Sequence, residues 1–230
     1  MKTKWKVLLT TLCALLLIVG SAAGTLAYLT SQDAVTNTFT VGEVTLGSDL
    51  QKGLDEALVN EYGQPINNDT DKTPVELAEA PRVRENDYKL VPGRTYIKDP
   101  TVHVNPASED CYVFVKVENG IAAYEAAAAT GESAYTPIAD QITGNGWSLL
   151  GGVADVYYQV YTKSDDGANL PVFGRFRIAG DANEKEGWAD INENQPKIIV
   201  TAYAVQKEGF AAAGDAWNAA FGTQNAASGS

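Results

Sequence analysis

The sequence of 230 residues is poor in the side chains on which most catalytic and metal sites depend. It has one histidine, His103, and two cysteines, Cys13 and Cys111. It lacks the HExxH motif of many zinc peptidases and a glycine-rich phosphate loop. Basic residues are also scarce, with 17 lysines and arginines against 29 aspartates and glutamates. Because so acidic a chain repels nucleic acid and anionic lipid, its charge argues against both as partners and suits an extracellular protein.

The first thirty residues have the layout of a secretory signal peptide. Lys2, Lys4 and Lys6 precede a predominantly apolar run over residues 7–19, and the small residues 20–24 follow it. A basic segment, an apolar segment and a small-residue cleavage zone in this order predict export from the cell.

Two cleavage sites satisfy the small-residue rule, one after Ala23 and one after Ala27. The apolar segment could also extend to Leu29, which would make it long enough for an uncleaved membrane anchor. Cleavage after Ala27 leaves 203 residues, enough for one sizeable core, and removes three lysines, so the net charge changes from −12 to −15.

Removal of the signal also removes Cys13 and leaves Cys111 as the single cysteine of the mature chain. No intramolecular disulfide can then form, so the core must supply the stability. Cys111 lies in an alternating apolar pattern and is predicted to be a buried, inert side chain, although pairing between chains stays open.

Short apolar runs separated by polar turns predict an all-β protein. The clearest strand is 111–117, where Cys111 and the valines at 113, 115 and 117 form the predicted core row. Further strands are expected at 38–46, 101–105, 153–162, 172–178 and 197–205. Short helices are expected from about residue 50 to Gly63, at 121–130 and at 210–221.

This pattern predicts an antiparallel two-sheet sandwich, most simply a jelly roll, with short peripheral helices. The predicted organisation is a signal peptide at 1–27, an N-terminal strand at 28–46, an acidic insertion at 47–82, the core strands at 83–207 and a C-terminal helix and tail at 208–230.

No catalytic residue is predicted. His103 lies mid-strand on a polar face and is expected to face solvent rather than to act in a triad. Calcium binding is an open possibility in three oxygen-rich loops, at 68–71, 165–166 and 181–186, although none has EF-hand spacing. The candidate ligands are Asp69, Asp71, Asp165 and Asp166. A carboxylate pair for glycoside hydrolysis also stays open, because an acidic chain always supplies some pair.

The residues around the cleavage zone carry a family resemblance. GTLAYLTSQD at 24–33, followed by NTFTVG at 37–42, resembles the start of the TasA/camelysin family. The segments at 91–93, 98–102, 112–117 and 201–206 resemble its later strands. The resemblance implies secretion by a Gram-positive bacterium through a signal peptidase of the SipW type, with the cut after Ala27 and Tyr28 as the first mature residue.

The resemblance further implies a jelly-roll subunit of extracellular biofilm-matrix fibres. Its partners would be other copies of the chain, the signal peptidase and an accessory matrix protein, with no nucleic acid and no membrane after cleavage. Segment 28–46 of one subunit would complete the sheet of the next by donor-strand complementation. The residues expected to carry this contact are Tyr28, Leu29, Phe39, Val41, Val44 and Leu46.

Three other interpretations stay open. Segment 28–46 could be an ordinary first strand of a monomer. The chain could be a secreted metallopeptidase, as camelysin members are described, although its single histidine does not support that activity. It could also be a calcium-stabilised surface module that binds glycan or protein.

Overall fold

The computed structural model describes residues 30–32, 53–106, 108–131, 134–191 and 196–222. All strand pairs in this part are antiparallel, which confirms the predicted all-β class. The strands are β1 (Thr30–Gln32), β2 (Leu54–Ala57), β3 (Arg82–Val83), β4 (Thr95–Ile97), β5 (Thr101–Val104), β6 (Cys111–Asn119), β7 (Ser148–Leu149), β8 (Val156–Tyr161), β9 (Ala168–Pro171), β10 (Arg175–Arg177) and β11 (Ile198–Gln206). The helices are α2 (Ile138–Gly144), α4 (Ala213–Phe221) and the 3₁₀ turns η1 (Leu77–Glu79), η3 (Ala182–Glu184) and η4 (Trp188–Asp190).

The longest strands form the centre of a five-stranded sheet with the order β1-β11-β6-β8-β7. β6 and β11 pair along nine residues each, from Cys111 opposite Gln206 to Asn119 opposite Ile198. Both strands are rich in valine, isoleucine and aromatic residues, which favour a pleated, half-buried backbone. The predicted strands 111–117 and 197–205 are therefore confirmed.

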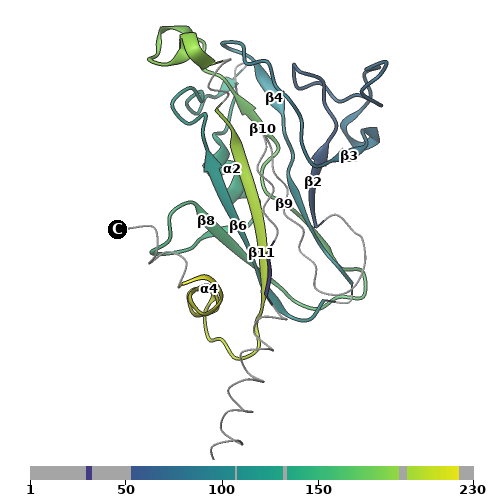
Figure 1. The fold of residues 1–230 in the computed structure, drawn as a ribbon, viewed down its shortest axis with the longest axis vertical. Coiled ribbons are helices and arrows are strands. Elements are labelled where there is room, and N and C mark those ends of the chain that lie inside the picture. The colour runs from purple at the N-terminus through teal and green to yellow at the C-terminus, as the bar shows by residue number, and fades with distance from the viewer. Residues whose placement is uncertain (1–29, 33–52, 107, 132–133, 192–195, 223–230) are drawn as a thin grey trace, which may run out of the picture.

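The remaining strands form a four-stranded sheet, β3-β2-β5-β9, and a two-stranded sheet, β10-β4. Figure 1 shows β6, β8 and β11 in one layer, and β2, β4 and β9 in a second layer beside it. Apolar side chains from both layers form one core, including Val113 and Val200 from the first and Leu54 and Val102 from the second. The two layers are therefore held together by hydrophobic burial.

Helix α4 covers the outer face of the five-stranded sheet (Figure 1). Trp217 and Phe221 pack on Phe114 and Tyr203, and the Phe114 and Trp217 rings lie 5.2 Å apart in an edge-to-face arrangement. The predicted C-terminal helix is confirmed, although it begins at Ala213 rather than Phe210. On β6, the even-numbered Tyr112 and Phe114 are thus buried as well as the predicted odd-numbered row, whereas Lys116 is partly exposed and Glu118 is exposed.

Two predicted helices are wrong. Leu54–Ala57 is strand β2, with all four side chains buried, because pairing with β5 and β3 overrides the local i, i+4 leucine pattern. Residues 121–130 form turns and two isolated bridges, Glu125 with Ile178 and Ala129 with Tyr135, instead of a helix. Within the described residues, no helix has the length and apolar character needed to cross a membrane.

Several predictions concern residues outside the described part of the chain. These are the signal peptide, the strand at 38–46 and the assembly residues Tyr28, Leu29, Phe39, Val41, Val44 and Leu46. Of the candidate donor segment, the structure describes β1, which pairs with β11 at the edge of the five-stranded sheet.

Candidate functional site

Strand β2 carries two neighbouring acidic side chains, Asp55 and Glu56, that are both buried. Successive side chains of a strand point to opposite faces, so each carboxylate reaches a different set of partners. A buried charge is costly unless it is paired and hydrogen-bonded. These two carboxylates and their partners therefore form the candidate site.

Glu56 is fully buried and binds two side chains at once. Its Oε2 pairs with Nζ of Lys98, which follows β4 and is 2% exposed. Its Oε1 accepts a hydrogen bond of 2.7 Å from Nδ2 of Asn86. One carboxylate therefore holds an amine and a carboxamide side by side.

Asn86 is fixed by two further hydrogen bonds to strand β2 and the residues that follow it. Its Nδ2 also donates to the carbonyl of Ala57, at 2.9 Å, and its Oδ1 accepts from the backbone N–H of Val59, at 2.8 Å. Every polar atom of this buried carboxamide has a partner, as buried polar groups require.

Burial shifts the pKa of both ionisable members of this group. Desolvation lowers the pKa of Lys98 to about 8, although the Glu56 carboxylate opposes the shift. Desolvation raises the pKa of Glu56 against the opposing effect of Lys98. Both shifts favour the neutral forms of the two groups.

An aromatic cluster lies next to this pair. The ring of Tyr88 packs edge to face against the rings of Tyr96 and Phe176, with centroid distances of 5.8 and 5.3 Å. The rings of Tyr96 and Phe176 stack with their centroids 4.9 Å apart. Burial raises the pKa of Tyr88, and the charge of Glu56 adds to this shift. The pair thus lies in apolar surroundings, where electrostatic interactions are strong.

Asp55 is the centre of a second group. Its Oδ1 accepts hydrogen bonds from Nε of Arg82, at 2.7 Å, and from Nε2 of His103, at 2.9 Å. Arg82 also donates through Nη1 to Asp99, at 2.5 Å. Burial tends to raise the pKa of Asp55, but the bonds from His103 and Arg82 outweigh it and lower the pKa.

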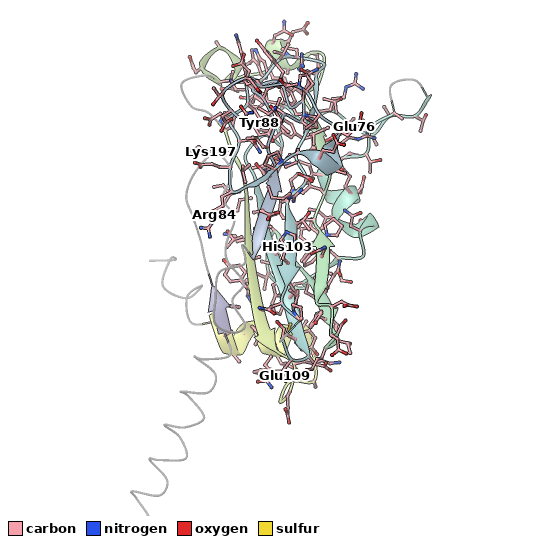
Figure 2. The ribbon with its side chains drawn as sticks, turned by 90° about the vertical axis from the view of Figure 1, so that its right-hand side faces the viewer. Glu76, Arg84, Tyr88, His103, Glu109 and Lys197 are labelled. Carbon is pink, nitrogen blue, oxygen red and sulfur yellow. The ribbon has the colours of Figure 1, made fainter. Side chains whose placement is uncertain are left out.

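The predicted solvent-facing position of His103 is wrong. Its side chain is 28% exposed, and Nδ1 lies 2.7 Å from Oδ1 of Asn169, the residue opposite it on β9. Figure 2 shows it midway along the strands, below Tyr88. Both ring nitrogens face acceptor oxygens, and the bond to Asp55 raises the pKa of His103, so the imidazolium form fits best.

Cys111 is buried, as predicted, at the start of β6. Desolvation raises the pKa of its thiol to about 12, and the nearby Asp110 adds to the shift. Because the thiolate is the nucleophilic form, this shift disfavours a nucleophilic role for Cys111 at neutral pH.

The candidate calcium ligands lie in two separate loops. Asp71 accepts hydrogen bonds within its own loop from the backbone of Thr73, at 3.0 Å, and from Asn67. The bond from Thr73 is the main cause that lowers the pKa of Asp71. Asp69, Asp165 and Asp166 are exposed. In the described ranges, no three His, Cys, Asp or Glu side chains are grouped as metal ligands would be.

Sequence reasoning missed Glu56, Asn86 and Lys98. It placed Glu56 on a short peripheral helix, and nothing local distinguishes these three residues from surface polar residues. No protein-family model, curated protein or solved structure matches this chain.

Proposed function

We propose that this protein is a secreted structural subunit of extracellular biofilm-matrix fibres, with a jelly-roll domain that assembles head to tail by donor-strand complementation. The observation that carries the proposal is the position of β1. Thr30–Gln32, from the candidate donor segment, pairs antiparallel with β11 at the edge of the main sheet. The N-terminal segment is thus able to occupy a sheet edge.

Among the described residues, β1 covers only part of the β11 edge. β1 pairs only with Tyr203, Ala204 and Val205, whereas β11 begins at Ile198. On this side, the described residues supply no strand partner for Ile198–Ala202. Unpaired edge groups of this kind are a template for a strand from another chain.

The same contact made between subunits gives a fibre. If segment 28–46 leaves the edge of its own subunit and pairs with β11 of a neighbour, each subunit both donates and receives a strand. Such a contact is heterologous and does not close, so it continues into a filament. Cleavage after Ala27 by a signal peptidase of the SipW type would free this segment, and an accessory matrix protein would start the fibre.

The described side chains support a structural role over a catalytic one. The ring nitrogens of His103 both face acceptor oxygens. The Cys111 thiol is buried and has a raised pKa. Neither residue is therefore suited to act as a general base or a nucleophile.

The test uses the secreted protein, whose N-terminus is sequenced before it is imaged by electron microscopy. We expect Tyr28 as the first residue, and fibres. Ser31→Pro removes a backbone N–H in β1 and should prevent assembly, while the matched variant Ser31→Ala keeps that N–H and should assemble. Strictly monomeric protein at high concentration, or fibres of undiminished yield from Ser31→Pro, would contradict the proposal.

A further inference from the structure

The Glu56 carboxylate binds two groups that can react with each other. Lys98 offers an amine nucleophile, Asn86 offers an acyl group, and Glu56 itself can carry protons between them. Nζ of Lys98 forms an ion pair with Oε2 of Glu56, and Nδ2 of Asn86 donates a hydrogen bond to Oε1. We propose that Lys98 and Asn86 condense to form an intramolecular isopeptide bond, with Glu56 as the proton-transfer catalyst. This cross-link is independent of fibre assembly and would form within a single subunit.

The reaction balances without a cofactor or an oxidant. Nζ of Lys98 attacks Cγ of Asn86, a new C–N bond forms, and the Cγ–Nδ2 bond breaks. Two protons pass from Nζ to Nδ2 through Glu56, which begins and ends as a carboxylate. The lysine ammonium and the asparagine carboxamide become a secondary amide and one ammonium ion.

The hydrogen bonds of Asn86 favour this reaction. The N–H of Val59 donates to Oδ1 at 2.8 Å, so it can polarise the carbonyl and stabilise the negative charge that develops on this oxygen. The carbonyl of Ala57 holds Nδ2 at 2.9 Å and fixes the plane of the carboxamide. The leaving nitrogen is therefore bound to the same carboxylate that delivers its protons.

The surroundings supply the reactive protonation states. Burial lowers the pKa of Lys98 and raises that of Glu56, so proton transfer from the ammonium to the carboxylate is favoured by desolvation. The neutral amine is the nucleophile, and the carboxylic acid can protonate the leaving nitrogen. Exclusion of water also protects the intermediate from hydrolysis.

Proximity lowers the remaining barrier. Groups that a fold holds on the two oxygens of one carboxylate react as if they were at very high concentration, which is how an unactivated amide becomes reactive. Two other lysine–glutamate pairs, Lys116–Glu118 and Lys163–Glu109, have side chains that are one-third or more exposed. They serve as internal controls, because those lysines are not desolvated as Lys98 is.

Peptide mapping of the secreted protein tests the cross-link directly. Trypsin does not cleave after an acylated lysine, so the bond should yield one branched peptide in which residues 85–89 are joined to residues 95–116. Its mass should equal the sum of the two linear peptides less one ammonia. Fragmentation should locate the link at Asn86 and Lys98. Linear peptides 85–89 and 95–98 in full yield from the wild-type protein would overturn the proposal.

Intact mass is a supporting measurement only. Loss of one ammonia also accompanies succinimide formation, for which Asn119-Gly120 and Asn145-Gly146 are candidate sites. The branched peptide distinguishes the two reactions, because a succinimide leaves peptides 85–89 and 95–98 separate.

Glu56→Gln tests the catalytic assignment. It keeps the size of the side chain but cannot carry the protons, so the branched peptide should fall to a small fraction of its wild-type yield. Lys163→Ala, which removes an exposed pair, should leave the yield unchanged. An unchanged yield in Glu56→Gln would overturn the role of Glu56, and if this variant does not fold, the wild-type peptide map alone decides whether the bond exists.

Discussion

At the scale of single residues, the most consequential feature is that two carboxylates on one short strand are both removed from water. Asp55 and Glu56 are retained inside because each has a cation and further hydrogen bonds. Loss of a partner leaves a buried charge without compensation, which costs far more than the net contribution of the intact pair.

Relative to wild-type protein in which Lys98 and Asn86 are not cross-linked, we expect Lys98→Ala to lower the free energy of unfolding by about 3–5 kcal/mol, because it leaves the Glu56 carboxylate buried without its cation. Replacement of both residues, Lys98→Met with Glu56→Leu, should recover most of that loss, since no charge is then buried. Denaturant titrations of the two variants and the wild type measure this. A double variant no more stable than Lys98→Ala would contradict the argument.

His103 and Asp55 give the stability a dependence on pH with opposite signs. The pKa of His103 is raised above 6.5, so its contribution is complete below that value and is lost as the pH rises through the folded-state pKa. The pKa of Asp55 is lowered below 3.8, so its contribution is present above that value and is lost as the pH falls through the folded-state pKa.

His103→Gln should therefore differ most from the wild type at pH values below 6.5, and the difference should shrink as the pH rises. Because His103 is the only histidine, no other imidazole contributes to this difference. Urea titrations of both proteins at a series of pH values measure it. A difference that is constant with pH would show that the ring acts only by packing.

At the scale of elements, α4 explains why the first half of β6 is buried on both faces. The odd-numbered residues of β6 face the second layer, and the even-numbered Tyr112 and Phe114 face α4. The helix is amphipathic, with Trp217 and Phe221 buried and Asn218 exposed. Its attachment therefore depends on a few large aromatic contacts.

Trp217→Ala should lower the free energy of unfolding by about 3–5 kcal/mol, because it leaves a cavity between α4 and the sheet. The matched variant Asn218→Ala, one residue further on the exposed side, should change it by less than about 0.5 kcal/mol. Thermal and denaturant unfolding of the two variants measure the contrast. Similar effects from both substitutions would show that α4 does not pack as described.

At the scale of the whole molecule, acidity bears on the proposed assembly. If cleavage follows Ala27 as proposed, each subunit carries a net charge of −15, and such subunits repel one another unless salt screens the repulsion. The screening length falls from about 30 Å at 0.01 M to about 8 Å at 0.15 M ionic strength. Fibre formation should therefore accelerate as salt is added.

Light scattering of freshly secreted protein at several salt concentrations measures this rate. The Ser31→Pro variant is the control for scattering that does not arise from strand pairing. A rate that falls with added salt would indicate that attractive charge pairs, rather than repulsion, dominate the encounter between subunits.

The long strands were predictable because their pattern repeats over many residues. Alternation along Cys111–Asn119 and Ile198–Gln206 leaves little choice of structure. The short strand β2 was not predictable, since Leu50, Leu54 and Leu58 fit a helix equally well and four residues carry too little local preference to decide. Glu56, Asn86 and Lys98 were missed for the same reason, because only pairing places them inside.

The sequence by itself determined the all-β class, the long strands, the C-terminal helix and the burial of Cys111. These follow from periodic hydrophobicity, which is a local property of the chain. Only the tertiary structure decided that Lys98 and Asn86 bind the same Glu56 carboxylate, and that β1 pairs with the edge of β11. Contacts between residues far apart in the chain depend on how the sheets pair and pack, and no local pattern records that arrangement.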